Sequence, residues 1–222
     1  MFRIKICGIT NLEDAQAVAE AGGDAIGLNF YKISPRFCPV EVAREISQAL
    51  PMHVRRVGVF VNSSAREIRD TYDSVGLDLI QIHGDETPTF LTELRGLPVM
   101  RAFRMPDDLA VVEVYLKCCH KLACVPRMVL VDAHRPGEYG GTGTALDWPA
   151  LPSQRRRLLG MPLVLAGGLN SENVGAAIAA VKPWAVDTAS GVEVAKGKKS
   201  PAMVRAFIEA SKAAFSHASA CH

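Results

Sequence analysis

The 222-residue sequence has no uninterrupted apolar run long enough to cross a membrane. Its first residues also lack the apolar core of a secretory signal, because Arg3 and Lys5 place charges there. Neither charge is in large excess, since 25 Lys and Arg residues and 23 Asp and Glu residues give a net charge of +2. Proteins that bind nucleic acids usually have a clear excess of basic residues, which this sequence lacks. We therefore expect a cytoplasmic protein that contacts neither membrane nor nucleic acid and that binds small molecules.

The six cysteines form no Cys-x-x-Cys pair and have no regular spacing, so the sequence does not indicate a disulfide framework. The segment 118–124 gathers Cys118, Cys119, His120 and Cys124. No second pair of ligands is present to complete a tetrahedral site, so we expect no bound metal. The segment is interpreted as a helix with incidental, reduced cysteines.

The chain also lacks low-complexity linkers and shifts in composition that would divide it. Short apolar runs recur eight times, each followed by helical spacing, which is typical of parallel β/α units. The predicted strands cover residues 2–7, 24–30, 55–62, 78–83, 98–104, 127–132, 162–166 and 184–188. The predicted helices cover residues 11–21, 40–50, 64–75, 87–95, 107–120, 147–159, 171–181 and 200–214.

The count of eight units favours an α/β fold in which the parallel strands close into a single (β/α)8 TIM barrel. A doubly wound open sheet also alternates strands and helices, but no G-x-G-x-x-G turn follows the first strand. Asn11 is a suitable cap for the first helix. We expect one barrel domain over residues 1–215 and a frayed tail over residues 216–222.

Two residues with proton-transfer chemistry end predicted strands. Cys7 ends the first strand and Asp132 ends the sixth, and the carboxyl ends of barrel strands face the ligand site. A thiol near positive groups, with a modestly lowered pKa, can accept a proton, and a carboxyl group screened from water can donate one. The alternatives are a small buried thiol at Cys7 and a helix cap or loop anchor at Asp132.

Glycine-rich turns follow the sixth, seventh and eighth predicted strands, at Gly140-Gly141-Thr142-Gly143, Gly167-Gly168 and Ser190-Gly191. In barrels the loops after strands seven and eight commonly bind phosphate through backbone N–H groups. We therefore expect a phosphate of the ligand there, between the strands that carry Cys7 and Asp132.

Lys5 shares a strand face with Cys7, so its ammonium is expected inside the barrel. A buried charge needs a partner, and Asp187 on the neighbouring eighth strand is our candidate. The alternative is that an irregular register turns Lys5 outward.

An ordered set of motifs resembles the phosphoribosylanthranilate isomerase family of tryptophan biosynthesis over nearly the whole chain. These motifs are Lys5-Ile6-Cys7-Gly8-Ile9-Thr10, Ser34-Pro35-Arg36, Val57-Gly58-Val59-Phe60-Val61-Asn62, Gln81-Ile82-His83-Gly84, Gly140-Gly141-Thr142-Gly143, Gly167-Gly168-Leu169 and Ser190-Gly191-Val192-Glu193. One departure is Ala189, where relatives often have serine, so a hydroxyl contact is absent there.

The resemblance implies a cofactor-free Amadori rearrangement of N-(5-phosphoribosyl)anthranilate to 1-(2-carboxyphenylamino)-1-deoxyribulose 5-phosphate. It implies that Cys7 is the general base and Asp132 the general acid. Arg36 would then bind the anthranilate carboxylate, although the sequence alone favours a surface arginine. His83 would line the anthranilate pocket or serve as a structural histidine. The remaining substrate contacts are expected from Gly143, Gly167, Gly168, Ser190 and Gly191.

Two other functions remain open. The related isomerase of histidine biosynthesis performs the same rearrangement on a substrate with two phosphates, but it relies on a pair of aspartates where this chain has Cys7 and Asp132. A non-catalytic barrel that binds phospho-sugars is also compatible with the fold. The chain could be a monomer or a homodimer, because the apolar residues Val111, Val112 and Val114 could pack internally or against a partner.

Overall fold

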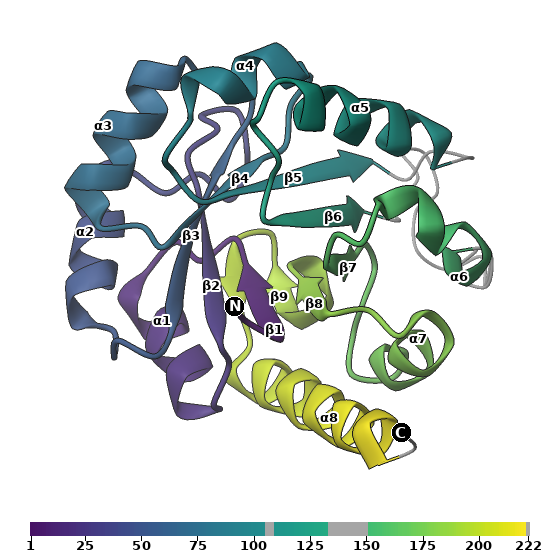
Figure 1. Ribbon diagram of the computed structural model, residues 1–222. Coiled ribbons are helices and arrows are strands. Elements are labelled where there is room, and N and C mark those ends of the chain that lie inside the picture. Colours follow the sequence, from purple (N-terminus) through teal and green to yellow (C-terminus); the bar gives the residue numbers. More distant parts are fainter. Residues whose placement is uncertain (105–108, 133–150, 221–222) are drawn as a thin grey trace.

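The computed structural model describes residues 1–104, 109–132 and 151–220 (Figure 1). A closed barrel is formed by eight parallel strands, which pair in sequence order, the last with the first. They are β1 (Ile4–Cys7), β2 (Ala25–Asn29), β3 (Arg55–Phe60), β4 (Leu79–Ile82), β5 (Val99–Arg104), β6 (Met128–Asp132), β7 (Leu163–Ala166) and β8 (Ala185–Thr188). The predicted (β/α)8 TIM barrel is confirmed.

Helices follow the strands along the chain and surround the barrel (Figure 1). They are α1 (Leu12–Glu20), α2 (Val40–Ala49), α3 (Ala65–Val75), α4 (Pro88–Glu93), α5 (Ala110–Lys121), α6 (Leu151–Gln154), the 3-10 helix η2 (Arg155–Leu158), α7 (Val174–Val181) and α8 (Pro201–Ala220). The Asn11 side chain accepts a hydrogen bond from the Asp14 backbone N–H, so the expected cap of α1 is confirmed. In the part of the chain that the structure describes, no helix has the length and apolar character needed to cross a membrane.

The last helix is longer than predicted, because α8 continues to Ala220 where the sequence predicted a helix end at residue 214. The boundary of the barrel domain at residue 215 stays a prediction. Phe215 is buried, and the Arg3 guanidinium carbon lies 4.2 Å from the centroid of its ring, so α8 packs against the segment before β1 at this position. The segment is also rich in alanine, which has the highest helix propensity.

Successive side chains of each strand point alternately to the helices and to the barrel interior, and this decides which of them reach the barrel mouth. On β6, Val129 and Val131 pack beneath the helices, whereas Met128 and Leu130 belong to the cluster inside the barrel. Because side chains alternate, Asp132 continues the inner row at the carboxyl end of the strand.

The same alternation operates on β1. Ile4 and Ile6 belong to the cluster between barrel and helices, so Lys5 and Cys7 face the interior. The two proton-transfer candidates therefore both reach the barrel mouth from the inner face.

A hairpin that the sequence did not predict follows β8. The 3-10 helix η3 (Ser190–Val192) leads into the antiparallel strands β9 (Glu193–Ala195) and β10 (Lys198–Lys199). Thr10, just after β1, donates a hydrogen bond from Oγ1 to the Gly197 carbonyl at 3.0 Å. The hairpin is thereby fixed beside the end of β1.

Candidate active site

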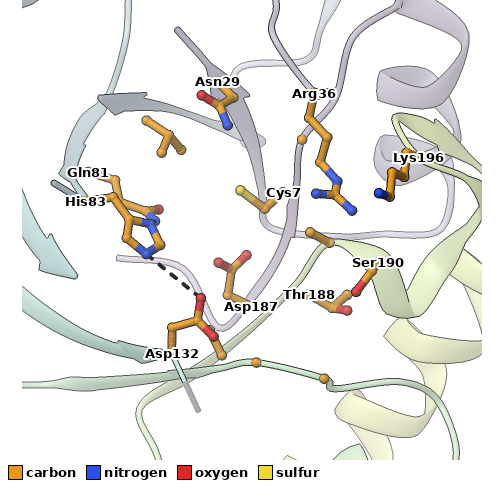
Figure 2. A pocket seen from close by; sticks show the side chains of 16 residues that line it. Cys7, Asn29, Arg36, Gln81, His83, Asp132, Asp187, Thr188, Ser190 and Lys196 are labelled. Carbon is orange, nitrogen blue, oxygen red and sulfur yellow. Dashed lines mark hydrogen bonds and ion pairs between the residues drawn. The ribbon is translucent and has the colours of Figure 1, made fainter. Parts of the chain in front are cut away.

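A cavity of about 720 Å³ lies at the carboxyl ends of the barrel strands (Figure 2). Seven of the residues singled out in the sequence line it, namely Cys7, Arg36, His83, Asp132, Gly167, Gly168 and Ser190. Gly191 follows Ser190 within η3, and Gly143 lies outside the described residues. With the other lining residues included, the carboxyl ends of seven strands, all but β5, and the loop after β2 contribute to one site.

Lys5 and Asp187 form a buried ion pair at the base of the cavity. The β1 and β8 register places them opposite each other, and Lys5 Nζ lies 3.0 Å from both carboxylate oxygens of Asp187. The expected pairing is confirmed. Burial alone would lower the pKa of Lys5, but the charges of Asp187 and of a Cys7 thiolate outweigh it, so the pKa is raised. Lys5 therefore remains an ammonium ion beneath Cys7.

The thiol of Cys7 lies over Gly27 of β2. A Cβ atom on Gly27 would be 2.6 Å from Cys7 Sγ and 3.0 Å from Lys5 Nζ, so only glycine leaves room for both groups. Burial raises the pKa of Cys7, although the charges of Lys5 and Lys199 act in the opposite direction. The expected net lowering by positive neighbours was wrong, because burial of the thiol outweighs the charges of Lys5 and Lys199, and the charge of Asp187 adds to the raising effect.

Asp132 and His83 face each other on the other side of the cavity (Figure 2). His83 Nε2 lies 3.9 Å from Asp132 Oδ2, and the Gln81 side-chain nitrogen lies 3.0 Å from His83 Nδ1. Among the described residues, the buried Gln81 Oε1 has no hydrogen-bond partner. Residues 133–150, which follow Asp132 in the chain, lie outside the described residues.

The turns after β7 and β8 lie against each other. Thr188 donates a hydrogen bond from Oγ1 to the Leu169 carbonyl at 2.6 Å, and a Cβ atom on Gly191 would collide with that same carbonyl. Gly167 and Gly168 have φ angles of 94° and 65°, which L side chains rarely adopt. These positions therefore require glycine, and they place backbone at the cavity wall where a phosphate was expected.

A sequence profile of the N-(5'phosphoribosyl)anthranilate (PRA) isomerase family matches residues 4–210. The chain belongs to the PRA isomerase family. It is similar to the N-(5'-phosphoribosyl)anthranilate isomerase of Pseudomonas putida, with 48% identity over 215 residues that cover 96% of this chain and 98% of the relative. The enzyme of Pseudomonas aeruginosa is also 48% identical, over 212 residues that cover 94% of each chain. The expected family and its isomerase class are thus confirmed.

Solved PRA isomerase structures have the same architecture. The enzyme from Thermotoga maritima superimposes with a TM-score of 0.83 at 41% identity, covering 96% of this chain and all of that one. A second PRA isomerase, in complex with reduced 1-(o-carboxyphenylamino)-1-deoxyribulose 5-phosphate, gives a TM-score of 0.81 at 38% identity, with coverage of 96% and 100%.

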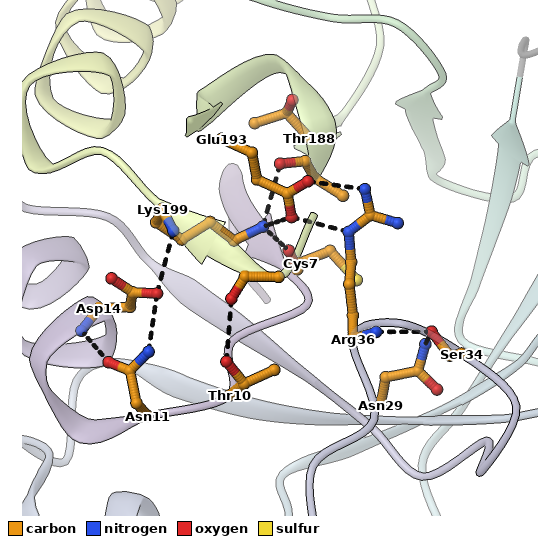
Figure 3. Close-up of polar contacts among 12 residues, drawn as sticks. Cys7, Thr10, Asn11, Asp14, Asn29, Ser34, Arg36, Thr188, Glu193 and Lys199 are labelled. Atoms are coloured by element: carbon orange, nitrogen blue, oxygen red, sulfur yellow. Dashed lines mark hydrogen bonds and ion pairs between the residues drawn. The ribbon is translucent and has the colours of Figure 1, made fainter. Parts of the chain in front are cut away.

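In this PRA isomerase family member, Arg36 is held by an acidic partner (Figure 3). Its Nε and Nη2 atoms each donate to one oxygen of Glu193 at 2.7 Å, a two-point contact typical of arginine and carboxylate. Lys199 donates to Glu193 at 2.8 Å and to the carbonyl oxygens of Cys7 at 2.7 Å and Ala189 at 3.0 Å. This buried network joins the end of β1 to the turn after β8.

Several cavity residues were missed in the sequence, among them Asn29, Gln81, Thr188 and Lys196. Asn29 and Gln81 could have been identified from the sequence as site residues, because each lies at or near the carboxyl end of a predicted strand. No feature of the sequence pointed to Lys196, since it lies in the turn of the unpredicted hairpin between β9 and β10.

The other cysteines in the described part of the chain lie outside this cavity. Cys119 is buried on α5, and Cys124 donates a hydrogen bond to the Pro88 carbonyl at 3.3 Å. Over the described residues, no group of three His, Cys, Asp or Glu side chains could hold a metal ion.

Val112 is buried, whereas Val111 and Val114 are exposed on the other side of α5. The choice between monomer and homodimer stays open; a related T. maritima structure is described as a monomeric form of a dimeric enzyme.

Proposed function

We propose that this chain catalyses the Amadori rearrangement of N-(5-phosphoribosyl)anthranilate to 1-(2-carboxyphenylamino)-1-deoxyribulose 5-phosphate, with Asp132 as general acid and Cys7 as general base. The observation that carries the proposal is the placement of these two groups in one cavity, on inner strand faces, beside a glycine turn suited to phosphate. Membership of the PRA isomerase family supports the reaction class. The proposal includes the expected cytoplasmic location and the absence of a cofactor.

The reaction requires two proton transfers at different atoms. Asp132 donates its proton to the furanose ring oxygen, the C1′–O bond breaks, and the nitrogen lone pair forms the C1′=N bond of a protonated Schiff base. The Cys7 thiolate then removes the proton at C2′, and the electron pair of that C–H bond gives an enolamine. Protonation at C1′ and loss of the C2′ hydroxyl proton produce the ketone.

Lys5 favours the thiolate form of Cys7, which is the form that accepts a proton. Its ammonium lowers the pKa of the thiol by charge and by a hydrogen bond, which partly counteracts the raising effect of burial. The substrate also has a carboxylate, for which Arg36 and Lys196 supply positive charge at the cavity wall. Glu193 accepts hydrogen bonds from Nε and Nη2 of Arg36, so Nη1 would be the donor to the substrate carboxylate.

Turnover of purified protein tests the function. N-(5-phosphoribosyl)anthranilate is expected to be converted to the ketose product without added metal or cofactor. The histidine-pathway aminoaldose substrate should be converted far more slowly, because Cys7 occupies the place of one aspartate of that enzyme. Binding of the phosphoribosyl compound without turnover would favour the non-catalytic alternative.

Gly191→Val is expected to raise KM strongly, because the new side chain collides with the Leu169 carbonyl and displaces the phosphate turn. The control is Gly175→Ala on α7, where an added Cβ has nothing within 4 Å. Steady-state kinetics and a ligand-bound structure check both variants. An unchanged KM for Gly191→Val, or a phosphate bound away from this turn, would contradict the assignment.

Arg36→Met is expected to raise KM by about 10- to 100-fold, the magnitude of a charge-assisted hydrogen bond, with little effect on kcat. The physical reason is that the substrate carboxylate is remote from the reacting carbons. Lys32→Met, at an exposed position of the same loop, is the control. A hundredfold fall in kcat with unchanged KM would show that Arg36 does not act by binding.

A further inference from the structure

His83 has a geometric relationship to the general acid that the mechanism above does not use. Gln81 and His83 are two residues apart at the end of β4, so their side chains project to the same side and reach the cavity (Figure 2). The Gln81 side chain is buried, and its nitrogen contacts His83 Nδ1 at 3.0 Å. The opposite ring nitrogen, Nε2, faces Asp132 Oδ2 at 3.9 Å.

The imidazole of His83 is neutral at physiological pH. Burial and then the charge of Lys5 lower the pKa of His83 to about 4. The charged groups that face the ring come from β1, β5, β6 and β8, and they are Lys5, Arg101, Arg104, Asp132 and Asp187. A neutral ring has one N–H and one acceptor nitrogen, so its partners determine which nitrogen carries the proton.

With the amide oriented so that its nitrogen faces Nδ1, Gln81 favours a proton on Nε2. An amide nitrogen can only donate, so Nδ1 must accept, and the proton of the ring is then on Nε2, directed at Asp132. If the amide were turned over, Oε1 would accept from Nδ1–H and Nε2 would present a lone pair to the carboxyl group. The two arrangements therefore predict opposite tautomers, which can be distinguished directly.

We propose that Gln81 and His83 are positioning residues for the general acid: Gln81 fixes the tautomer of His83, and His83 Nε2–H holds Asp132 Oδ2. The observed distance of 3.9 Å is longer than a hydrogen bond, so the proposed bond requires Nε2 and Oδ2 to approach to about 3 Å. The bond strengthens when Asp132 becomes a carboxylate, so it stabilises the charge that develops as the proton leaves. The inference rests on the proposed role of Asp132.

Loss of the Nε2–H donor removes a group that favours ionised Asp132, so the pKa of Asp132 is expected to rise by about one unit in His83→Phe. For the same reason kcat is expected to fall about tenfold, with little change in KM. Gln81→Met removes the side chain that fixes the His83 tautomer, so it is expected to raise the pKa of Asp132 and to lower kcat by smaller amounts. His53→Phe, at an exposed position, is the matched control and should change none of these quantities.

The decisive measurement is NMR of the ligand-free protein, labelled with 15N in histidine and 13C in the aspartate carboxyl groups. We expect His83 to carry its proton on Nε2 at pH 7 in the wild type, and we expect the Asp132 titration midpoint to move upward in His83→Phe and Gln81→Met. A proton on Nδ1 in the wild type, or an Asp132 midpoint unmoved in both variants, would overturn the inference. These signals do not depend on turnover, so they separate a failure of this inference from a failure of the proposed reaction.

Discussion

Cys7→Ser and Asp132→Asn are each expected to lower kcat by at least about 100-fold while substrate binding is retained. Serine preserves the shape of Cys7, but its hydroxyl has a pKa far above neutrality and cannot supply an anionic base at working pH. Asparagine preserves the shape of Asp132 but has no acidic proton to transfer. Because the two protons move at different atoms, neither residue should substitute for the other.

Steady-state kinetics and a binding titration with the product check these two variants. Cys118→Ser, on the outer helix α5, is the matched control for the thiol and should retain wild-type kcat. A Cys7→Ser protein that keeps more than about a tenth of wild-type kcat would lose less than a general base normally contributes, and Cys7 would not be the base.

Lys5→Met is expected to destabilise the fold by about 3–5 kcal/mol, because it leaves the Asp187 carboxylate buried without its counter-ion. It also removes the ammonium that lowers the thiol pKa, so the pKa of Cys7 should rise further and kcat should fall. Denaturant unfolding measures the first effect. Arg55→Met is the control, since the Arg55 side chain is half exposed and its pair with Asp78 lies at the surface, where such a pair should contribute about 1 kcal/mol or less.

A double substitution separates stability from activity. Lys5→Met combined with Asp187→Leu removes both charges and should recover much of the lost stability, since apolar replacements of buried pairs are often tolerated. Activity should remain low because the thiol still lacks its cation. If Lys5→Met alone unfolds at the same denaturant concentration as the wild type, the pair does not have the assigned role.

The sequence was sufficient to predict those site residues whose position depends on the alternation of side chains between the two faces of a strand. A period of two fixes Lys5 and Cys7 on one face, and parallel register then brings Asp187 opposite Lys5. The same rule places Asp132 at the mouth. Glycine turns after β7 and β8 were also predictable, because the barrel fold puts such turns beside the ligand.

Contacts between distant loops were not predictable. Arg36 and Glu193 are separated by 157 positions, and their pairing depends on a hairpin that has no distinctive sequence pattern. The pKa of Cys7 was misjudged for a related reason. Its sign depends on the balance of burial, Lys5 and Asp187, and sequence shows the neighbours of a residue but not the degree of its burial.

A substrate with deuterium at C2′ tests most directly whether Asp132 and Cys7 act on separate steps. Cys7→Ser slows removal of the C2′ proton, so we expect a large primary isotope effect on kcat in that variant. Asp132→Asn slows ring opening, which precedes this step, so its isotope effect should be close to unity. A large isotope effect in Asp132→Asn together with none in Cys7→Ser would contradict the assignment of both residues.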